Sequence, residues 1–577
     1  MSDIGPRSRP LGPHHADPPP PRRDEIVQLD GNAKRAIETG RTRLLVAGAL
    51  FVVAYLVIAV RLVTVMLLTD GAEPRIAAVP AQAAPVERGE IVDRNGVVLA
   101  TNLTTYSLYA NPQQIMDVDE AVNGLAGLFP DLGKETIRGK LTSGRSFEWI
   151  KRNLTPRERS AVIRLGVPGL SFQEEERRIY PQGRLTAHVI GFTDIDNRGL
   201  AGVEQSFDEV LRQGHRQIAL ALDIRIQNIL HEEVSRAIAD FRAVGGSGMV
   251  LDIDTGEMLG MVSLPDFDPN SPGEAPDETR FNRNTLGVYE MGSTFKLFNT
   301  AMALDDGVIS LGDRFNATHP LRVSGYTIHD FHPENRWLTV PEIIQYSSNI
   351  GSALIAAEVG TERQKEFMAR VGMLKPVSLE LPELGQPMYP DRWTSLSTMT
   401  IAYGHGIAVT PLHLLAGVAG LIDGGMYRPV TLMKRDGGAP LAGRRIIKEA
   451  TSTDIRKLMR LVVESGTGKS ANVPGYLVGG KTGTAEKTMG RGYNSNASLA
   501  SFIAAFPMSA PRYAVLVIVD SPKPNAASHG FATAGWVSAP AVGRVIERMA
   551  PILGMAPLPD NATEARNDLL IPASATE

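Results

Sequence analysis

The stretch "YEMGSTFKLFNTAMALDDG", residues 289–307, contains a serine and a lysine at S-x-x-K spacing. Ser293 and Lys296 stand at the start of an apolar-periodic segment with Gly307 near its end, which predicts a helix. Because residues i and i+3 share a helix face, the Lys296 amine can reach the Ser293 hydroxyl. Serine alone is a weak nucleophile, so this adjacent base is what acyl transfer requires.

A lysine acts as that base only if its pKa falls, and partial burial beside a second cation would lower it. Lys481 is the candidate cation, in "YLVGGKTGTAEK", residues 476–487, which we interpret as an edge strand. Thr482 and Thr484 supply hydroxyls that, with Lys481, could hold a carboxylate. Gly483 is expected to let a substrate backbone lie against the strand.

A third motif, S-x-N, lies between two helical stretches in "IIQYSSNIGSALIA", residues 343–356. Ser347 offers a hydroxyl to relay protons, and Asn349 offers an amide to position a substrate carbonyl or Lys296. Taken singly, Ser293 fits a helix N-cap, Asn349 a turn residue and Lys481 a solvated strand charge. In this order, however, S-x-x-K, S-x-N and K-T-G form the triple of penicillin-binding proteins and serine β-lactamases.

The same region raises a rival interpretation, because "GYLVGGKT", residues 475–482, satisfies G-x-x-x-x-G-K-[ST]. A phosphate loop needs a strand before it and a helix beginning at its Lys-Ser/Thr. Here Pro474 stands upstream, and Gly483 downstream costs a helix about 1 kcal/mol relative to alanine. We therefore reject the nucleotide site and interpret "VLVIVD", residues 515–520, as a buried central strand.

Composition narrows the class of protein further. The 577 residues are enough for two or three folded units, and the net charge of -4 comes without a long basic block, which disfavours nucleic acid as a partner. The absence of cysteine excludes disulfides and cysteine-based metal sites. The 11 histidines show no H-E-x-x-H or comparable spacing, so neither a metal ion nor a cofactor is expected.

Residues 44–68 form an apolar run interrupted only by Arg61, long enough for a transmembrane helix. A buried core helix would show a polar stripe, and a cleaved signal peptide would have a leader shorter than these 43 residues. Basic residues precede the run, namely Lys34, Arg35, Arg41 and Arg43. By the positive-inside rule the N-terminus is cytoplasmic and the remainder is outside. Residues 1–43, with "DPPPPRR", are predicted to be a disordered tail, and residues 69–85 a linker.

Three further stretches carry a family resemblance: "RGEIVDRNGVVLA" (88–100), "YPQGRLTAHVIGFTDIDNRGLAGVEQSFD" (180–208) and "YGHGIAVTPLHL" (403–414). With the catalytic triple, they resemble the class B penicillin-binding proteins, most closely the septal, FtsI-type peptidoglycan D,D-transpeptidases. The resemblance runs from Arg88 to about Met549. His413 stands where the family usually has glutamine.

The resemblance implies an α+β multidomain chain with a single N-terminal transmembrane helix. It predicts an α/β stalk-like pedestal at residues 86–218 and a transpeptidase domain at 219–556, an antiparallel sheet sandwiched by helices. Residues 557–577 are predicted to be a flexible tail. A set of charged residues is expected to hold one module against the next through charge-assisted hydrogen bonds: Arg88, Asp93, Arg94 and Glu204.

The resemblance also implies a chemistry for the site. Lys481, Thr482 and Thr484 would bind the terminal carboxylate of a D-Ala-D-Ala stem peptide, and Ser293 would attack the penultimate carbonyl. A neighbouring stem peptide would resolve the acyl-enzyme into a crosslink, and β-lactams would acylate the same serine. The implied location is the inner membrane at the division septum, with a periplasmic catalytic domain. The implied partners are a multispanning (SEDS-type) glycan polymerase and other divisome proteins.

Three alternative functions remain to be weighed against transpeptidation. Hydrolysis, as in a β-lactamase or D,D-carboxypeptidase, depends on water placement that sequence does not reveal. A bifunctional glycosyltransferase is disfavoured, because only about 150 residues separate anchor from catalytic domain and no E-D-x-x-F-x-x-H motif occurs. A β-lactam sensor or idle scaffold is the non-enzymatic alternative, and the intact triple speaks against the scaffold.

Overall fold

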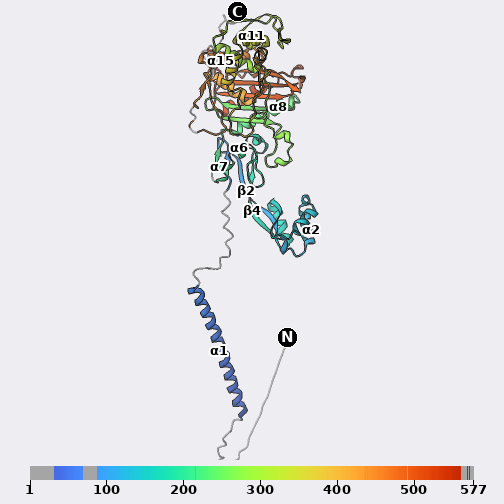
Figure 1. Cartoon of the computed structure of the whole chain (residues 1–577), viewed down its shortest axis with the longest axis vertical. Coiled ribbons are helices and arrows are strands. Elements are labelled where there is room, and N and C mark those ends of the chain that lie inside the picture. The colour runs from blue at the N-terminus through green and yellow to red at the C-terminus, as the bar shows by residue number, and fades with distance from the viewer. Residues whose placement is uncertain are drawn as a thin grey trace, which may run out of the picture. The chain divides into compact units, whose positions relative to one another are not determined.

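The computed structural model describes residues 31–68, 87–214, 216–435, 437, 440–489, 492–559, 568–569 and 571 (Figure 1). The chain separates into two units, Met1–Pro85 and Val86–Glu577, and each is considered by itself.

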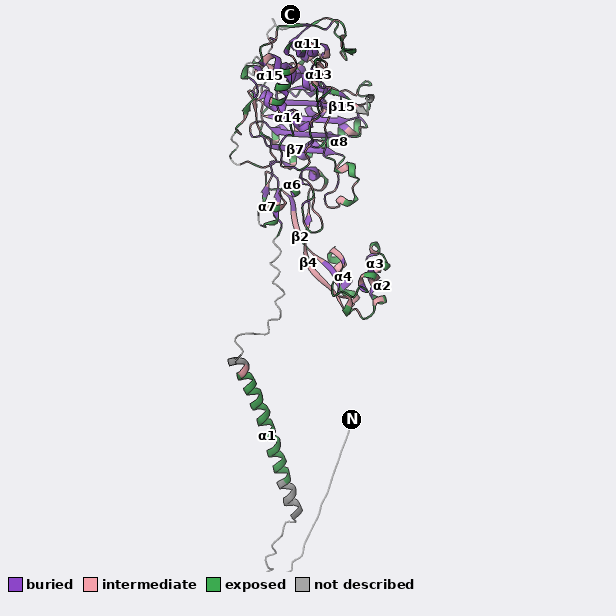
Figure 2. Ribbon diagram, viewed as in Figure 1, coloured by how far each residue is buried: buried purple, intermediate pink, exposed green. Residues whose placement is uncertain are grey.

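The first unit contains one long helix, α1 (Gly31–Leu68). Within it Thr39–Thr64 is long and apolar enough to cross a membrane, and its side chains are exposed (green in Figure 2). The helix begins at Gly31, which corrects the prediction of disorder for residues 31–43. The reason is local, since this stretch holds helix formers such as Ala33, Lys34 and Arg35 and lacks proline. The rest of the predicted tail and the predicted linker lie outside the described residues.

The second unit begins with a small sheet of five strands. Its order is β3-β2-β1-β5, with β4 paired to β2; only the β1–β5 pair is parallel. The strands are β1 (Ile91–Val92), β2 (Val98–Ala110), β3 (Glu148–Leu154), β4 (Leu170–Ile179) and β5 (Ile218–Ala219). The helices of this region are α2 (Val118–Leu128), α3 (Lys134–Leu141), α4 (Pro156–Leu165), α5 (Ala187–Ile190), α6 (Gly202–Ser206) and α7 (Asp208–Arg212). Helices α2, α3 and α4 share a small core of their own with β3, built around Leu125 and Phe129.

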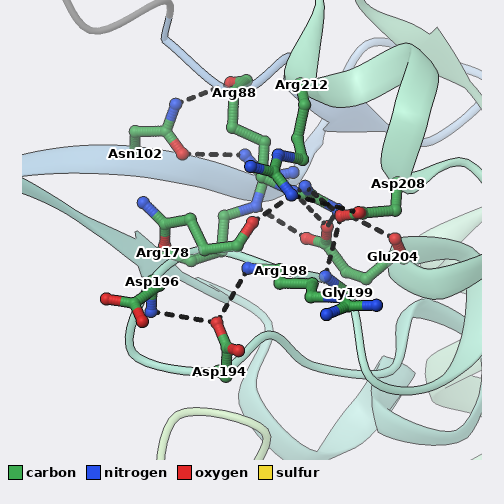
Figure 3. A network of polar contacts seen from close by, with 11 residues as sticks. Arg88, Asn102, Arg178, Asp194, Asp196, Arg198, Gly199, Glu204, Asp208 and Arg212 are labelled. Carbon is green, nitrogen blue, oxygen red and sulfur yellow. Dashed lines mark hydrogen bonds and ion pairs between the residues drawn. The ribbon is translucent and has the colours of Figure 1, made fainter.

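Charged side chains from β4, α6 and the residues before β1 form a buried network (Figure 3). The Glu204 carboxylate accepts from Arg88 Nε at 2.7 Å and from Arg178 Nε at 2.6 Å. All three side chains are at most 2% exposed. Arg88 also donates to Asp208 at 2.6 Å. These residues therefore hold β4, α6 and the first residues of the unit together, rather than joining one module to the next as predicted.

The link to the following region runs through Asp93 and Arg94 instead. Asp93 Oδ2 accepts from the backbone N–H of Ile224 at 3.2 Å, and Arg94 pairs with Glu257 at 3.4 Å. The Arg94 backbone N–H also donates to Leu222 O at 2.9 Å. For these two residues the structure agrees with the expected role of joining the modules.

A second five-stranded sheet lies at the centre of the remaining chain, in the order β14-β15-β16-β6-β7 with every pair antiparallel. The strands are β6 (Gly245–Asp252), β7 (Met258–Leu264), β14 (Gly479–Met489), β15 (Gly492–Phe506) and β16 (Tyr513–Asp520). As predicted, residues 515–520 lie in a central strand, and Lys481 lies on a strand at the edge.

Alternate side chains of the central strand enter two different cores, which explains its continuous apolar sequence. Val515, Val517 and Val519 pack with α8 (Ile224–Asp240) and α16 (Ser538–Ile552). Leu516 and Ile518 pack on the other face, in the core that includes α9 (Lys296–Asp305), α14 (Pro411–Ile422) and α15 (Glu449–Glu464). The sheet is therefore sandwiched between helices, and its strands are buried (purple in Figure 2).

The other helices of this region are α10 (Val340–Gln345), α11 (Asn349–Val359), α12 (Thr361–Arg370) and α13 (Ser395–Ile401). Four short strands lie between α9 and α10: β8 (Arg314–Asn316), β9 (Leu321–Val323), β10 (Tyr326–Ile328) and β11 (Trp337–Thr339). Two more lie between α14 and α15: β12 (Met426–Tyr427) and β13 (Arg444–Arg445). The predicted C-terminal tail needs a partial correction. Leu558 N–H donates to Gly475 O at 2.7 Å, and Leu569 is buried because its side chain joins the apolar core.

We predict that Glu204→Gln lowers the free energy of unfolding by about 3–5 kcal/mol, because the buried Arg178 guanidinium loses its carboxylate partner and the buried Arg88 guanidinium keeps only Asp208. Thermal unfolding of the detergent-solubilised chain measures the change. Arg212→Ala is the matched control: Arg212 lies 3.8 Å from Asp208 and is 56% exposed. That control should cost roughly 0–1 kcal/mol. Equal effects of the two substitutions would contradict the role given to the network.

Candidate active site

Ser293 and Lys296 lie where a 3-10 turn, η6 (Gly292–Phe295), runs directly into α9. Lys296 is the first residue of the α-helix and is fully buried. Its Nζ lies 2.8 Å from Ser293 Oγ, so the predicted contact across one helix face is present. The turn before the serine is possible because Gly292 has a φ of +55°.

The S-x-N residues reach the same amine from the turn between α10 and α11. Lys296 Nζ lies 2.7 Å from Asn349 Oδ1, 3.1 Å from Ser347 Oγ and 2.7 Å from Ser347 O. Ser348 is the N-cap of α11, and its Oγ accepts from Gly351 N–H at 3.0 Å. Ser347 thus presents both its hydroxyl and its carbonyl to the amine.

Lys481 lies on the edge strand β14, and its side chain reaches the same cluster of Ser293, Lys296, Ser347 and Asn349. Its Nζ lies 3.0 Å from Ser347 Oγ and 3.1 Å from Thr482 O, and its side chain is fully buried. Ser347 Oγ is therefore a bridge between the two amines. The structure brings together all five residues that the sequence singled out as catalytic.

Burial changes the protonation of both lysines, because a low-dielectric environment disfavours the charged form. Burial first, and the charge of Lys481 second, hold the pKa of Lys296 well below its usual value, while Asp330 opposes the shift. Burial lowers the pKa of Lys481 to about 7. A neutral Lys296 amine beside a serine hydroxyl is suited to act as a general base.

The surroundings of Gly483 include a contact that the sequence did not indicate. A Cβ added there would lie 2.6 Å from Met291 O and 2.5 Å from Ser501 Oγ. The glycine therefore admits the backbone that precedes Ser293, and its expected contact with a substrate backbone stays a prediction. Gly404 likewise permits a close backbone approach, because a Cβ there would collide with Gly292 O. The missing Cβ of Gly483 thus lets the serine turn lie against β14, and that of Gly404 lets the segment between α13 and α14 lie against the same turn.

The hydroxyl-bearing residues of this group line one side of a cavity of about 580 Å³, whereas the two lysines are buried behind its wall. Ser293, Ser347 and Asn349 form part of its wall, with Thr482 and Thr484 of β14. Thr482 Oγ1 lies 2.7 Å from Thr467 Oγ1, and Thr484 Oγ1 accepts from Ala534 N–H at 3.3 Å. Further lining side chains are Phe331, His332, Tyr346, Lys469, Glu486 and Trp536.

Three residues near the site were missed by the sequence motifs. Thr467 belongs to "GTGKS", residues 466–470, a stretch that fails the phosphate-loop spacing. His405 lines the cavity, and burial first and the charge of Lys296 in addition lower the pKa of its imidazole. Asp330 contacts the start of α11. Only Thr467 had a sequence signal, since it stands in a glycine-rich turn before the K-T-G strand.

Comparison with protein families agrees with this geometry. Residues 246–545 match the penicillin-binding protein transpeptidase domain, and residues 83–235 match the penicillin-binding protein dimerisation domain. The chain belongs to the class B penicillin-binding proteins. The predicted fold class is confirmed, with one N-terminal apolar helix, a mixed α/β module and a transpeptidase domain with an antiparallel sheet between helices.

Relatives of known name cover most of this class B penicillin-binding protein. The "probable peptidoglycan D,D-transpeptidase FtsI" of Caulobacter vibrioides is 42% identical over 490 residues, 82% of this chain and 83% of its own. The peptidoglycan D,D-transpeptidase FtsI of Escherichia coli is 31% identical over 499 residues, 81% of this chain and 83% of its own.

Among solved structures, penicillin-binding protein 3 of Mycobacterium tuberculosis in complex with aztreonam shares the fold. Its TM-score is 0.65 at 23% identity, covering 82% of this chain and 98% of that one.

His413, which replaces the family's common glutamine, has a structural place. It is 2% exposed, its Nδ1 lies 2.6 Å from Thr410 Oγ1, and its Nε2 lies 2.8 Å from Lys375 O. His413 and Thr410 form the capping box at the start of α14. One ring nitrogen thus contacts the cap of α14, and the other holds this helix to the segment that follows α12.

We predict that Gly483→Ala slows acylation of Ser293 by a labelled penicillin by about tenfold or more, because displacement of a reacting group by about 1 Å is costly. The added Cβ must push the Met291–Ser293 backbone away from β14. Gly273→Ala is the matched control, since a Cβ there meets nothing within 4 Å. An unchanged acylation rate in the Gly483 variant would show that the Met291–Ser293 backbone can accommodate the added Cβ, which would contradict the prediction.

Proposed function

We propose that this chain is a serine-type peptidoglycan D,D-transpeptidase that crosslinks stem peptides during septal wall synthesis and is acylated by β-lactams. The observation that carries the proposal is the buried Lys296 amine, 2.8 Å from Ser293 Oγ and within 3.1 Å of Ser347 Oγ. Membership in the family supports the same activity, and the naming of its relatives as FtsI supports the septal role.

In the first half-reaction, Ser293 Oγ attacks the penultimate D-Ala carbonyl and its proton passes to Lys296 Nζ. The backbone N–H groups of Ser293 and Thr484 are the proposed oxyanion donors, each worth about 3 kcal/mol of barrier. The amide C–N bond then breaks, and the leaving D-Ala amine takes a proton. Ser347 Oγ can pass that proton on, because it lies within 3.1 Å of Lys296 Nζ and 3.0 Å of Lys481 Nζ.

In the second half-reaction the amine of a neighbouring stem peptide attacks the ester carbonyl of the acyl-enzyme. The ester C–O bond breaks, the new amide is the crosslink, and a proton returns to Ser293 Oγ. Asn349 holds Lys296 by a 2.7 Å contact and thereby keeps the base aligned through both steps.

The terminal carboxylate of the donor peptide is assigned to the β14 side of the cavity. Thr482 and Thr484 line the cavity there, whereas Lys481 is fully buried behind them. The two hydroxyls are therefore proposed to contact the carboxylate, with Lys481 supplying positive charge at short range. This refines the expectation that Lys481, Thr482 and Thr484 bind the carboxylate together.

The remaining parts of the proposal concern place and partners. α1 would span the inner membrane with the N-terminus cytoplasmic and the catalytic domain periplasmic, which the basic residues before the span support. The pedestal is assigned to residues 86–218 and the transpeptidase domain to 219–556. Because a transpeptidase alone makes no glycan, a SEDS-type polymerase and other divisome proteins are the proposed partners.

Ser293→Ala should abolish both the covalent penicillin adduct and crosslinking of stem peptides, because no other nucleophile occupies the place of its hydroxyl. Denaturing gels of the full chain in detergent detect the adduct, and analysis of muropeptide products detects the crosslink. In the unsubstituted protein the adduct should persist over hours. Rapid turnover of the adduct without crosslinking would instead assign the chain to the hydrolytic class.

The absence of cysteine makes a topology experiment possible in an otherwise unreactive chain. A membrane-impermeant maleimide should label Ser143→Cys but not Ser2→Cys in cells whose outer envelope admits the reagent. Ser143 is exposed in the second unit. Lysed cells provide the control, because both variants should then react. Labelling of the Ser2 variant alone in intact cells would reverse the proposed orientation.

A further inference from the structure

The loop between β10 and β11 carries a carboxylate that contacts the start of α11. Asp330 Oδ2 accepts from Ser348 Oγ at 2.7 Å, and Asp330 Oδ1 accepts from the Ile350 N–H at 2.9 Å. The first N–H groups of a helix lack intrahelical partners. Asp330 and Ser348 satisfy two of them, at Ile350 and Gly351.

His329, the residue before Asp330, contacts the side-chain amide of Asn349. Asn349 Nδ2 donates to His329 O at 2.9 Å, while Asn349 Oδ1 accepts from Lys296 Nζ at 2.7 Å. The amide orientation is thus set by a backbone carbonyl on one side and the lysine on the other. Two consecutive loop residues therefore fix the three-residue turn that presents Ser347 and Asn349 to Lys296.

Asp330 also acts on Lys296 through its charge. Burial and the charge of Lys481 lower the pKa of Lys296, and the charge of Asp330 raises it. The titratable groups facing Lys296 are Lys481 from β14, Asp330 from this loop and His405 from the segment between α13 and α14. The contacts from Ser293, Ser347 and Asn349 are made by neutral groups.

We propose that Asp330 is a positioning residue of the acylation site: it secures the cap of α11 so that Ser347 and Asn349 meet Lys296. This inference rests on the proposed acylation of Ser293. A negative charge at a helix N-terminus is stabilising, so the Asp330 carboxylate stabilises the start of α11 in addition to its effect on Lys296.

The two roles have separable consequences for the rate of acylation. A lysine base works in its neutral form, so the rate rises with pH through the acid limb of the profile. Removing the Asp330 charge takes away the group that raises the pKa of Lys296. The acid limb should then move to lower pH, the opposite of what a simple loss of structure would produce.

The experiment measures the second-order rate of penicillin acylation against pH for the full chain in detergent. In Asp330→Asn the midpoint of the acid limb should fall by about one pH unit, since a nearby opposite charge shifts a pKa by this order. The amide can still accept from Ile350 N–H and contact Ser348, so the structure is largely kept. In Ser348→Ala, which cuts the tie but keeps the charge, the plateau should fall several-fold with an unchanged midpoint.

Asp313→Asn is the matched control, because Asp313 accepts from Ser310 N–H at 2.7 Å and makes no contact with α11 or Lys296 among the described residues. It should leave both midpoint and plateau unchanged. A wild-type midpoint in Asp330→Asn, or a wild-type plateau in Ser348→Ala, would overturn the proposal. If Asp330→Asn does not fold, the Ser348 variant still decides the positioning role. Failure of the unsubstituted chain to be acylated would overturn the proposed function instead.

Discussion

The chemistry of this protein depends on one buried amine. Lys296 is fully enclosed, and its Nζ lies among oxygen atoms of Ser293, Ser347 and Asn349. An ammonium group in such surroundings loses its hydration, which lowers its pKa. The Lys481 amine contacts the Ser347 hydroxyl as well. The site therefore gains an amine whose pKa is held well below the usual lysine value, which favours the neutral form that a base needs. Its hydrogen-bond partners keep this enclosed amine from being an unsatisfied polar group.

The enclosure in turn requires that three distant segments approach one another closely. The serine turn and the α10–α11 turn come from the helical side, and Lys481 comes from the edge strand of the sheet. Because β14 is an edge strand, one of its sides has no neighbouring strand, and its residues Thr482 and Thr484 line the cavity. Gly483 and Gly404 permit the close approach, because a Cβ at either position would strike backbone oxygen. The position of the cavity thus follows from the topology.

Much of this could be predicted from the sequence, because the motifs are local. S-x-x-K at a helix start, S-x-N in a turn and K-T-G on an edge strand each have a pattern that spacing reveals, and the apolar run 515–520 shows a strand buried on both faces. The contacts between segments could not be read in this way. Asp330 stands 18 residues before Ser348 in a loop without periodicity. Arg88 and Glu204 both lie inside the predicted pedestal, residues 86–218, yet no pattern showed that they pair with each other rather than across the module boundary. The packing of the Met291 backbone against Gly483 is likewise a contact between distant segments, which no local pattern indicates.

The backbone at Ser347 shows how the fold and the chemistry constrain each other. Its φ is +61°, a left-handed conformation that costs a residue with a side chain on the order of 1–3 kcal/mol. Glycine would adopt this conformation with little strain, but it would lack the hydroxyl that lies within reach of both Lys296 and Lys481. The strain is held in place because Ser348 caps α11 directly after it and Asp330 secures that cap. A strained serine at this turn is therefore best explained by the hydroxyl itself, since the turn alone would be better served by glycine.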